Sequence, residues 1–479
     1  MYQSEHRSVD ERASSGRAAR SWTPRSAHAN WQRAADAPDP TAVLIAQNAT
    51  REPDLVPVRH GRMSVSPLAF YRGAAAVMAA DLSATPVAGL NVQLCGDAHL
   101  SNFGAFASPE RQLIFDLNDF DETLPGPFEY DVKRMAASFM VAARDNGHSN
   151  ADARAATLAS VTAYREAMLS FAGMPTMDIW YARLAEDDIR RGIRRVVKTA
   201  SPAKKNGQRG AAQRAAQRAR GRLAKAHTRD SLQALSELGE QVDGRYRIAS
   251  RQPIVVPARE LAAAFGLSPQ HVERVVGEQF RAYRATLPDD RRRLLERFEI
   301  VDVAHKVVGV GSVGTRAFIV LLQGRDMHDP LFLQVKEASS SVLEAYLGRS
   351  RYRNHGARVV QGQRLMQAAS DIFLGWTKGE DGNRCFYWRQ LRDMKMSADV
   401  DRMMPTGLTF YGRICGWTLA RAHARSGDPV AIAAYLGAKD AFDRSIVEFA
   451  RRYADQNERD FEEFRSLIRS GRLEATEGV

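Results

Sequence analysis

The sequence predicts an α+β protein with a helical part and an antiparallel-sheet part. Helix signals dominate both ends of the 479-residue chain; residues 130–146, for example, place apolar side chains at helical spacing. Between residues 298 and 395, β-branched and aromatic runs alternate with turn residues, a pattern typical of antiparallel strands, and one inserted helix is expected at 340–369. The length suits two or three packed domains.

Five segments follow along the chain. Residues 1–50 are rich in Ala, Arg, Ser and Pro and are expected to be mostly flexible. Ser66 followed by Pro67 combines an N-cap with a proline at the first helical position, so a helix is expected over 66–83. The other expected segments are a part with two polar loops (51–198), a basic linker with a helical insertion (199–297), a sheet lobe (298–395) and C-terminal helices (396–479).

The positive charge is concentrated in one segment. The net charge is +12, yet residues 190–229 contain 14 Lys or Arg and no Asp or Glu, so the rest of the chain is close to neutral. This segment is either a solvated linker or exposed helix, or a contact for an anionic partner such as nucleic acid. Because no Phe, Tyr or Trp lies between the basic residues, stacking on single-stranded nucleic acid is not indicated.

The sequence also bears on the compartment. No run of about 18 apolar residues is present, so no membrane span is expected. The N-terminal residues lack the apolar core of a signal peptide and include acidic side chains, which argues against a transit peptide. Cys95, Cys385 and Cys415 match no zinc or disulfide spacing. We therefore expect a cytoplasmic protein.

The first chemical motif is CGDAHLSN, from Cys95 to Asn102, directly after an expected buried strand. An aspartate at this point, Asp97, can accept a proton from an attacking hydroxyl group. The side-chain oxygen of Asn102, five residues later, can help to hold a metal ion from the same loop. Gly96 permits a tight backbone before the aspartate.

The second motif is FDLNDFDE, which follows another expected strand. Four carboxylates in seven residues repel one another unless they are solvated or bound to cations. Such oxygen ligands suit Mg²⁺ or Mn²⁺, and the candidate ligands are Asp116, Asp119 and Asp121. The alternative is an acidic turn that faces solvent. The proximity of the Asp97 loop, one strand earlier, favours the metal site because both loops should reach the same edge.

The third motif is a glycine-rich turn between two expected strands. In a dinucleotide-binding fold such a turn leads into a helix, whereas here the strand-like run AFIVLLQG follows. A glycine-rich turn between antiparallel strands is how kinases cover phosphates. The candidate phosphate-binding residues in this turn are Gly309, Gly311, Ser312 and Gly314.

A lysine follows the glycine-rich turn on the next expected strand. Strand alternation places Lys336 on the face of Gln334 and opposite Val335, so this lysine is either a phosphate ligand or an exposed strand residue. Glu344 is the candidate partner of Lys336. Glu337 is the less favoured alternative, because adjacent strand positions face opposite sides.

These motifs resemble those of known phosphotransferases. GDAHLSN resembles the catalytic loop of aminoglycoside-phosphotransferase-like and choline-kinase-like enzymes, and DFDETLPGPFEYD resembles their metal-binding run. The resemblance implies that Asp97 is the catalytic base, with His99 shaping its loop. It also implies that Asn102 and Asp119 are metal ligands and that Asp131 holds the catalytic loop from the following helix.

A closer resemblance covers residues 40–465. The segments SPLAFYRG, CGDAHLSNFG, FDLNDFDE, NHGARVVQGQRLMQ and LARAHARSGD resemble those of the bacterial domain of unknown function 2252 family. That family implies little about chemistry. The motif order differs from that of kinases, since the glycine-rich turn follows the catalytic and metal loops. A circular permutation of a two-lobed, kinase-like fold would explain this order.

Three functions remain open at this point. The first is an ATP- and Mg²⁺- or Mn²⁺-dependent phosphotransferase that acts on an unknown hydroxyl acceptor, in which the sheet lobe binds the nucleotide. The second is a non-catalytic, nucleotide-binding pseudokinase module, and the third is a metal-dependent phosphoesterase. Transfer of AMP in place of phosphate would use the same residues. The insertion at 147–297 is expected to shape the acceptor pocket, because such sites lie in the more variable elements.

Overall fold

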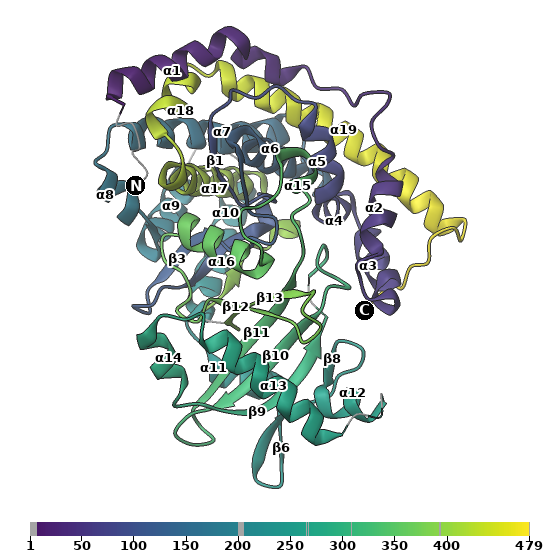
Figure 1. Ribbon diagram of the computed structural model, residues 1–479. Helices are drawn as coiled ribbons and strands as arrows, with labels where there is room; N and C mark the ends of the chain where they lie inside the picture. The colour runs from purple at the N-terminus through teal and green to yellow at the C-terminus, as the bar shows by residue number, and fades with distance from the viewer. Residues whose placement is uncertain are drawn as a thin grey trace.

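The computed structural model describes residues 7–199, 206–264, 266, 268–307, 309–391 and 394–478. Figure 1 shows a helical part packed against one end of a smaller part that contains the largest sheet. The mixed α+β class predicted from the sequence is therefore confirmed. Among the described residues, no helix combines the length and apolar character needed to cross a membrane.

The helical part contains segments from both ends of the chain. Its long helices α6, α7, α17 and α19 pack against one another around the chain's first strands. Its helices are α1 (Val9–Trp22), α2 (Pro40–Asn48), α3 (Val56–Met63), α4 (Pro67–Gly73), α5 (Ala75–Ser83), α6 (Phe128–Asp145), α7 (Asn150–Ala172), α8 (Thr176–Tyr181), α9 (Glu186–Thr199), α10 (Asn206–Ala226), α17 (Pro405–Ser426), α18 (Pro429–Leu436) and α19 (Ala441–Arg469). Its strands are β1 (Asn91–Leu94), β2 (Phe103–Ala107), β3 (Leu113–Leu117), β4 (Leu124–Pro127), β5 (Leu184–Ala185) and β14 (Met396–Ser397).

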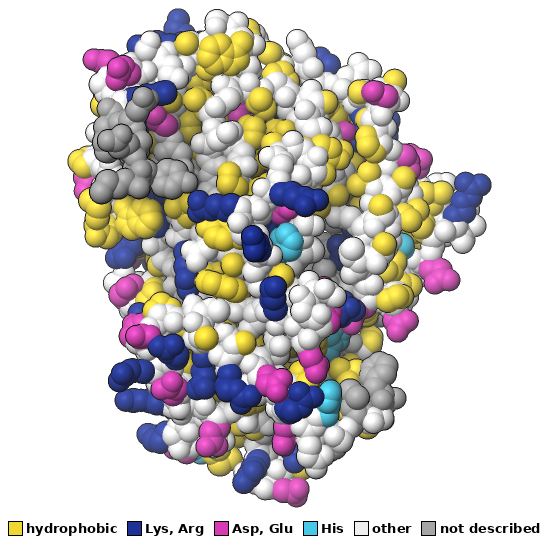
Figure 2. Space-filling model, viewed as in Figure 1, with side chains coloured by type: hydrophobic (Ala, Val, Ile, Leu, Met, Phe, Trp, Pro, Cys, Tyr) yellow, Lys and Arg dark blue, Asp and Glu magenta, His cyan; other side chains and the backbone are white. Residues whose placement is uncertain are grey.

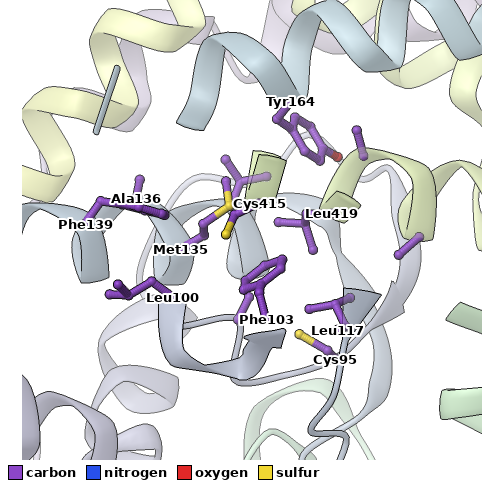
Figure 3. Packing of buried hydrophobic residues seen from close by; sticks show 14 of the residues in the cluster. Cys95, Leu100, Phe103, Leu117, Met135, Ala136, Phe139, Tyr164, Cys415 and Leu419 are labelled. Atoms are coloured by element: carbon purple, nitrogen blue, oxygen red, sulfur yellow. The ribbon is translucent and has the colours of Figure 1, made fainter. Parts of the chain in front are cut away.

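The main core lies beneath the strands that carry the first two motifs. Figure 3 shows Phe103 and Leu117 from these strands packed with Met135 of α6 and Cys415 of α17. All four side chains are fully buried, so each contributes roughly 1.5–3 kcal/mol of hydrophobic stabilisation. This core fixes the strand ends from which the polar loops emerge.

The second part is built on a six-stranded antiparallel sheet in the order β12-β13-β11-β10-β9-β8. Its strands are β8 (Val255–Pro257), β9 (Glu299–Lys306), β10 (Ala317–Gln323), β11 (Pro330–Ala338), β12 (Gly375–Lys378) and β13 (Cys385–Gln390). The accompanying elements are α11 (Ser231–Leu238), the hairpin β6 (Gly239–Val242) and β7 (Arg245–Ile248), α12 (Ala258–Ala264), α13 (Pro269–Arg284), α14 (Asp289–Leu295), α15 (Glu344–Leu347) and α16 (His355–Met366). The predicted antiparallel sheet is confirmed, and the inserted helix expected at 340–369 is two shorter helices.

Both faces of this sheet are covered, as the strand alternation requires. Ile319 and Leu321 of β10 join the cluster formed with α11, whereas Val320 and Leu322 join the cluster formed with α13 and α14. The strand therefore buries successive side chains on opposite faces. Residues 147–297 do not form one insertion, because α7 packs in the helical part while α11–α14 cover the sheet.

The N-terminal segment, which we expected to be mostly flexible, is helical over much of its described length. Helix α1 begins with a capping box between Ser8 and Glu11 and packs on α18. Arg33 forms ion pairs with Asp81 and Asp460, at 2.7 Å each. The Ser-x-x-Glu signal was present in the sequence, but these long-range ion pairs had no local signal.

The basic segment 190–229 falls on α9 and α10, with residues 200–205 outside the described range. Some of its arginines make surface ion pairs, such as Arg190 with Glu186 and Arg222 with Asp399. Such exposed pairs contribute little stability. The anionic partner expected for this segment therefore stays a prediction.

Candidate active site

The three polar motifs meet at two adjoining cavities between the helical part and the sheet. The larger cavity measures about 1090 Å³ and is lined by Asp97 and Asn102 as well as by the glycine-rich turn. The smaller cavity measures about 360 Å³ and is lined by Lys336. Asp119 and residues of the glycine-rich turn line both cavities. Segments separated by about 200 residues therefore border two neighbouring cavities that share Asp119, Gly309 and Ser312 as wall residues.

The loop after β1 is held in place from α6. The carboxylate of Asp131 accepts hydrogen bonds from the backbone N–H of Cys95 (2.8 Å) and of Gly96 (3.1 Å). This is the role expected for Asp131. Gly96 has a φ of +86°, and a Cβ atom there would lie 2.2 Å from the carbonyl oxygen of Glu122. Only glycine fits this position.

The carboxylate of Asp97 is oriented by a buried arginine. Nε of Arg134 donates to Oδ1 of Asp97 at 2.7 Å, and the guanidinium stacks over the ring of Tyr71 at 3.9 Å. The other oxygen, Oδ2, lies 3.6 Å from Nε2 of His99. The Asp97 side chain remains 19% exposed and lines the larger cavity, so a bound hydroxyl group can reach it.

His99 is a neutral member of this loop. Burial, together with the charges of Arg72 and Arg134, lowers the pKa of His99 well below its ordinary value. Nδ1 of His99 accepts a hydrogen bond from the backbone N–H of Ser101 at 3.2 Å. In the neutral ring the proton is therefore on Nε2, the nitrogen that faces Asp97. This arrangement positions the loop and does not supply an acid at neutral pH.

The side-chain amide of Asn102 is held in place by its own loop. Its side-chain NH₂ group donates to the backbone carbonyl of Asp97 at 2.8 Å. The amide NH₂ group is thereby used within the loop, while Asn102 lines the larger cavity near Asp119. The amide oxygen is the atom that remains for a metal ion or another donor.

The acidic loop after β3 combines two carboxylates with one lysine from the sheet. Nζ of Lys336 donates to Oδ2 of Asp121 at 2.6 Å, and the Tyr387 hydroxyl donates to Oδ1 at 2.7 Å. Asp119 has weaker support: within the described residues, its Oδ1 accepts a 3.3 Å hydrogen bond from the backbone N–H of Asp121. Lys336 is 4% exposed and Asp121 is 27% exposed.

The two carboxylates differ in their electrostatic environment. Burial and the neighbouring charge of Asp121 raise the pKa of Asp119. Burial also acts to raise the pKa of Asp121, but the charge of Lys336 and the hydrogen bonds from Lys336 and Tyr387 outweigh it and lower that pKa. The charges of Lys336 and Arg389 also act on Asp119, but no direct ion pair to its carboxylate is found within the described residues. A divalent ion held by oxygens of Asp119 and Asn102 fits this donor set.

Not every acidic residue of the second motif faces the cavities. Asp116 forms a buried ion pair with Arg421 and accepts from the backbone N–H of Ala368 at 2.8 Å, and it lines neither cavity. Its expected place among the metal ligands is wrong, because Arg421 already neutralises it. Glu122 lies at the larger cavity, and burial raises its pKa to about 7. Within the described part of the chain, no three His, Cys, Asp or Glu side chains group as a metal site by themselves.

The glycine-rich turn joins the adjacent antiparallel strands β9 and β10, as predicted. Gly309 and Gly314 have φ values of +75° and +86°. The turn is also fixed to the N-terminal helices. The backbone N–H of Glu52 donates to the carbonyl of Gly314 at 2.8 Å, and Arg51 donates to the carbonyl of Val313. The turn is thus a firm wall shared by both cavities.

The expected partner of Lys336 needs correction. Lys336 and Gln334 line the smaller cavity and Val335 joins the core on the opposite face, as strand alternation predicted. However, the ion pair of Lys336 is with Asp121 and not with Glu344. Glu344 instead lies 3.8 Å from Arg358 and 3.7 Å from His355, on the wall of the larger cavity.

Several supporting residues had no signal of their own in the sequence. Arg358 donates to the backbone carbonyls of Asp121, Thr123 and Ser339, and so joins the acidic loop to the sheet. Nε2 of His423, on α17, lies 3.2 Å from Oδ2 of Asp131. Both side chains are buried, which suits structural roles behind the site.

The wall of the larger cavity differs from our expectation for the acceptor pocket. Its described lining residues come from 43–76, 97–122, 309–315 and 337–355, and none falls in the segment 147–297. The insertion packs elsewhere, because its apolar residues are used in the helical core and against the sheet. Helix α2, the α4–α5 junction and the α15–α16 loop form this wall instead.

A known protein family matches most of the chain. No curated protein and no solved structure matches the chain. One family, described as "Uncharacterized protein conserved in bacteria (DUF2252)", matches residues 51–467. The matched range includes the catalytic-type loop, the acidic loop, the glycine-rich turn and the lysine strand. The chain belongs to this DUF2252 family.

Proposed function

We propose that this protein is an ATP- and Mg²⁺-dependent phosphotransferase with a permuted, kinase-like arrangement of motifs. The observation that carries the proposal is that Asp97 and Asn102 line one cavity, Lys336 lines the adjoining one, and Asp119 and the glycine-rich turn line both. These are the residue types that phosphoryl transfer requires for a base, a metal and the phosphates.

The order in which the turn, strands and helix of the sheet lobe follow one another along the chain supports the kinase-like interpretation. A glycine-rich turn joins β9 to β10, β11 carries the lysine, α16 follows, and β12 and β13 complete the sheet. Gln390 at the end of β13 and Leu391 line the smaller cavity, and the chain then continues to β14 in the helical part. In this proposal the loops at 96–102 and 116–122 come first in the chain and the sheet lobe later, which is a permuted order.

The proposed chemistry relies on position and charge. Asp97 would accept the proton of the acceptor hydroxyl while the acceptor oxygen forms a bond to the γ-phosphorus. The bond from that phosphorus to the β,γ-bridging oxygen breaks, and ADP departs with the electron pair. Asn102 and Asp119 would hold Mg²⁺, which supplies charge neutralisation for the phosphate oxygens. Lys336 would donate to the phosphates from the opposite wall.

One observation favours a second candidate, the non-catalytic nucleotide-binding module. Lys336 is already paired with Asp121 and with the ring of Tyr387, so a nucleotide must compete for this cation. Binding without turnover would result if that exchange were incomplete. Turnover therefore has to be measured separately from binding.

The test is calorimetric titration of ATP with Mg²⁺ into the native protein and into Asp119→Ala and Lys336→Ala variants. Asp326→Ala is the matched control, since this carboxylate lies in an exposed turn of the same sheet. We expect binding to the native and control proteins and at least about tenfold weaker binding to both site variants. The proposal is refuted if the native protein shows no binding of ATP, either with or without Mg²⁺. Phosphorus NMR of the products then separates ADP release from AMP transfer.

A further inference from the structure

The larger cavity has a basic wall on the side away from Lys336. Arg51 and Arg72 come from the N-terminal helices and their linkers, and Arg349, Arg353 and His355 come from the loop before α16 and its first residue. All five line the same cavity as Asp97. Figure 2 shows Lys and Arg side chains gathered around a histidine on this face, near the level at which Figure 1 places α15 and α16.

Three nitrogens of this wall are buried without a hydrogen-bond partner among the described residues. They are Nε of Arg51, Nε of Arg72 and Nδ1 of His355. Buried cationic groups in proteins are normally paired, because leaving them unpaired is costly. The negative charges of Asp97 and Asp401 act on the Arg72 guanidinium, yet no hydrogen bond from this side chain is found within the described chain. These three nitrogens of the wall are therefore available for hydrogen bonds with a bound ligand.

Of the acidic residues around the cavity, Glu344 lies 3.7 Å from His355 of this wall, whereas three others are paired with cations outside it. Asp97 pairs with Arg134, Asp121 pairs with Lys336, and Glu337 pairs with Arg316. Those three cations do not belong to the basic wall. The arginines of the wall thus keep a positive potential that faces the acceptor side of Asp97.

Two of the arginines are also free to adapt to a ligand. Arg349 and Arg353 are exposed, and no ion pair to either is found within the described residues. Arg351, between them, instead donates to the Tyr352 hydroxyl at 2.7 Å, stacks on that ring and does not line the cavity. Two neighbouring arginines that line the same cavity suit a group with several anionic oxygens.

We propose that this wall binds the phosphate group of the acceptor, so that the acceptor is a small hydroxyl compound that already carries a phosphate. This inference rests on the proposed function, because it assumes that the acceptor hydroxyl approaches Asp97. A phosphate with three terminal oxygens matches several guanidinium groups, whereas a single carboxylate is satisfied by one arginine fork. The cavity volume of about 1090 Å³ is at the upper end of ligand sites, which leaves space for a nucleotide and a second small molecule.

The experiment uses the full chain with the nucleotide site filled by Mg²⁺ and a non-hydrolysable ATP analogue. Calorimetry then measures the binding of inorganic phosphate, of glycerol 3-phosphate and of glycerol. We expect glycerol 3-phosphate to bind, glycerol not to bind, and the Arg349→Gln/Arg353→Gln double variant to bind glycerol 3-phosphate at least about tenfold more weakly. The control is Arg351→Gln, which removes one arginine charge from the same loop but not from the cavity, and it is compared with the single variants Arg349→Gln and Arg353→Gln as well as with the double variant.

The outcomes separate this inference from the proposed function. Equal losses in the control and the double variant mean a non-specific charge effect and overturn the inference. If the analogue binds but neither inorganic phosphate nor glycerol 3-phosphate does, the basic wall is not a phosphate site and the phosphotransferase proposal remains. If the analogue does not bind while phosphate binding depends on Arg349 and Arg353, the phosphate site stands and the proposed function fails. Melting temperatures of all variants exclude unfolding as the cause.

Discussion

The ion pair between Lys336 and Asp121 can be tested by removing its two members separately and together. Lys336→Met leaves Asp121 and Asp119 side by side without their principal cation, whereas Asp121→Asn removes one of the two negative charges. The double variant replaces the pair by a neutral amide and an apolar side chain. If the pair mainly neutralises the acidic loop, Lys336→Met is the most harmful of the three changes.

The size of the effect follows from the geometry. At 2.6 Å and an effective dielectric constant of about 20, the attraction is about 6 kcal/mol, and desolvation of both groups offsets part of it. Breaking a buried pair costs about 3–5 kcal/mol, and the 27% exposure of Asp121 places this case at the lower end. We expect Lys336→Met to lower the free energy of unfolding by about 3 kcal/mol and the double variant by about 1 kcal/mol.

Urea unfolding followed by circular dichroism measures these free energies, with and without Mg²⁺. In Lys336→Met, Asp119 and Asp121 lose the charge of the Lys336 ammonium. Mg²⁺ should therefore stabilise this variant more than the native protein. An additive double-mutant cycle, with a coupling energy near zero, would refute the reasoning. So would Mg²⁺ stabilisation that is equal in all four proteins, since the acidic loop would then not be the binding site.

Three further predictions concern residues behind the site and outside it. Gly96→Ala should reduce turnover by about 100-fold and also lower the free energy of unfolding, because the added Cβ meets the Glu122 carbonyl, strains the positive-φ backbone and displaces the Asp97 loop; single-turnover kinetics and urea unfolding check this. Arg421→Met should destabilise the protein by about 3–5 kcal/mol in urea unfolding, because Asp116 is left buried without its cation, and Mg²⁺ should not rescue it. Burial lowers the pKa of His28 to about 3, so the unfolded chain binds the extra proton between pH 6.5 and 3 and stability rises with pH across that window; between pH 5 and 7 the gain is about 2 kcal/mol, and unfolding of His28→Phe should lack it.

The parts of the site that could be predicted are the parts governed by local sequence. Gly96 and Asp97 follow a short buried strand, and a glycine before a polar residue indicates a tight turn wherever that strand lies. The face of Lys336 followed from the alternation of β11 alone. The antiparallel connection through the glycine-rich turn followed from the strand-like residues on both sides of it.

The parts that could not be predicted depend on contacts between distant segments. Nothing near Glu344 indicates that Arg358 and His355 surround it while Asp121 takes Lys336. The composition of residues 1–50 resembles that of flexible segments, but the segment is helical in much of its described part because of partners such as Asp460, more than 400 residues away. Long-range partners of this kind override local propensity and carry no local signal.

The position of Lys336 connects the two parts of the molecule to the proposed chemistry. Its strand belongs to the six-stranded sheet, while Asp121 belongs to a loop of the helical part, so their ion pair joins the two parts between the adjoining cavities. Under the proposed function, the nucleotide phosphates take over Lys336 and Mg²⁺ takes over the compensation of the acidic loop. The coupling energy between Lys336 and Asp121 should therefore fall when ATP and Mg²⁺ are both bound. A coupling energy that stays unchanged under saturating ATP and Mg²⁺ would mean that Lys336 remains paired with Asp121. The lysine would then have a structural role and would not be a phosphate ligand.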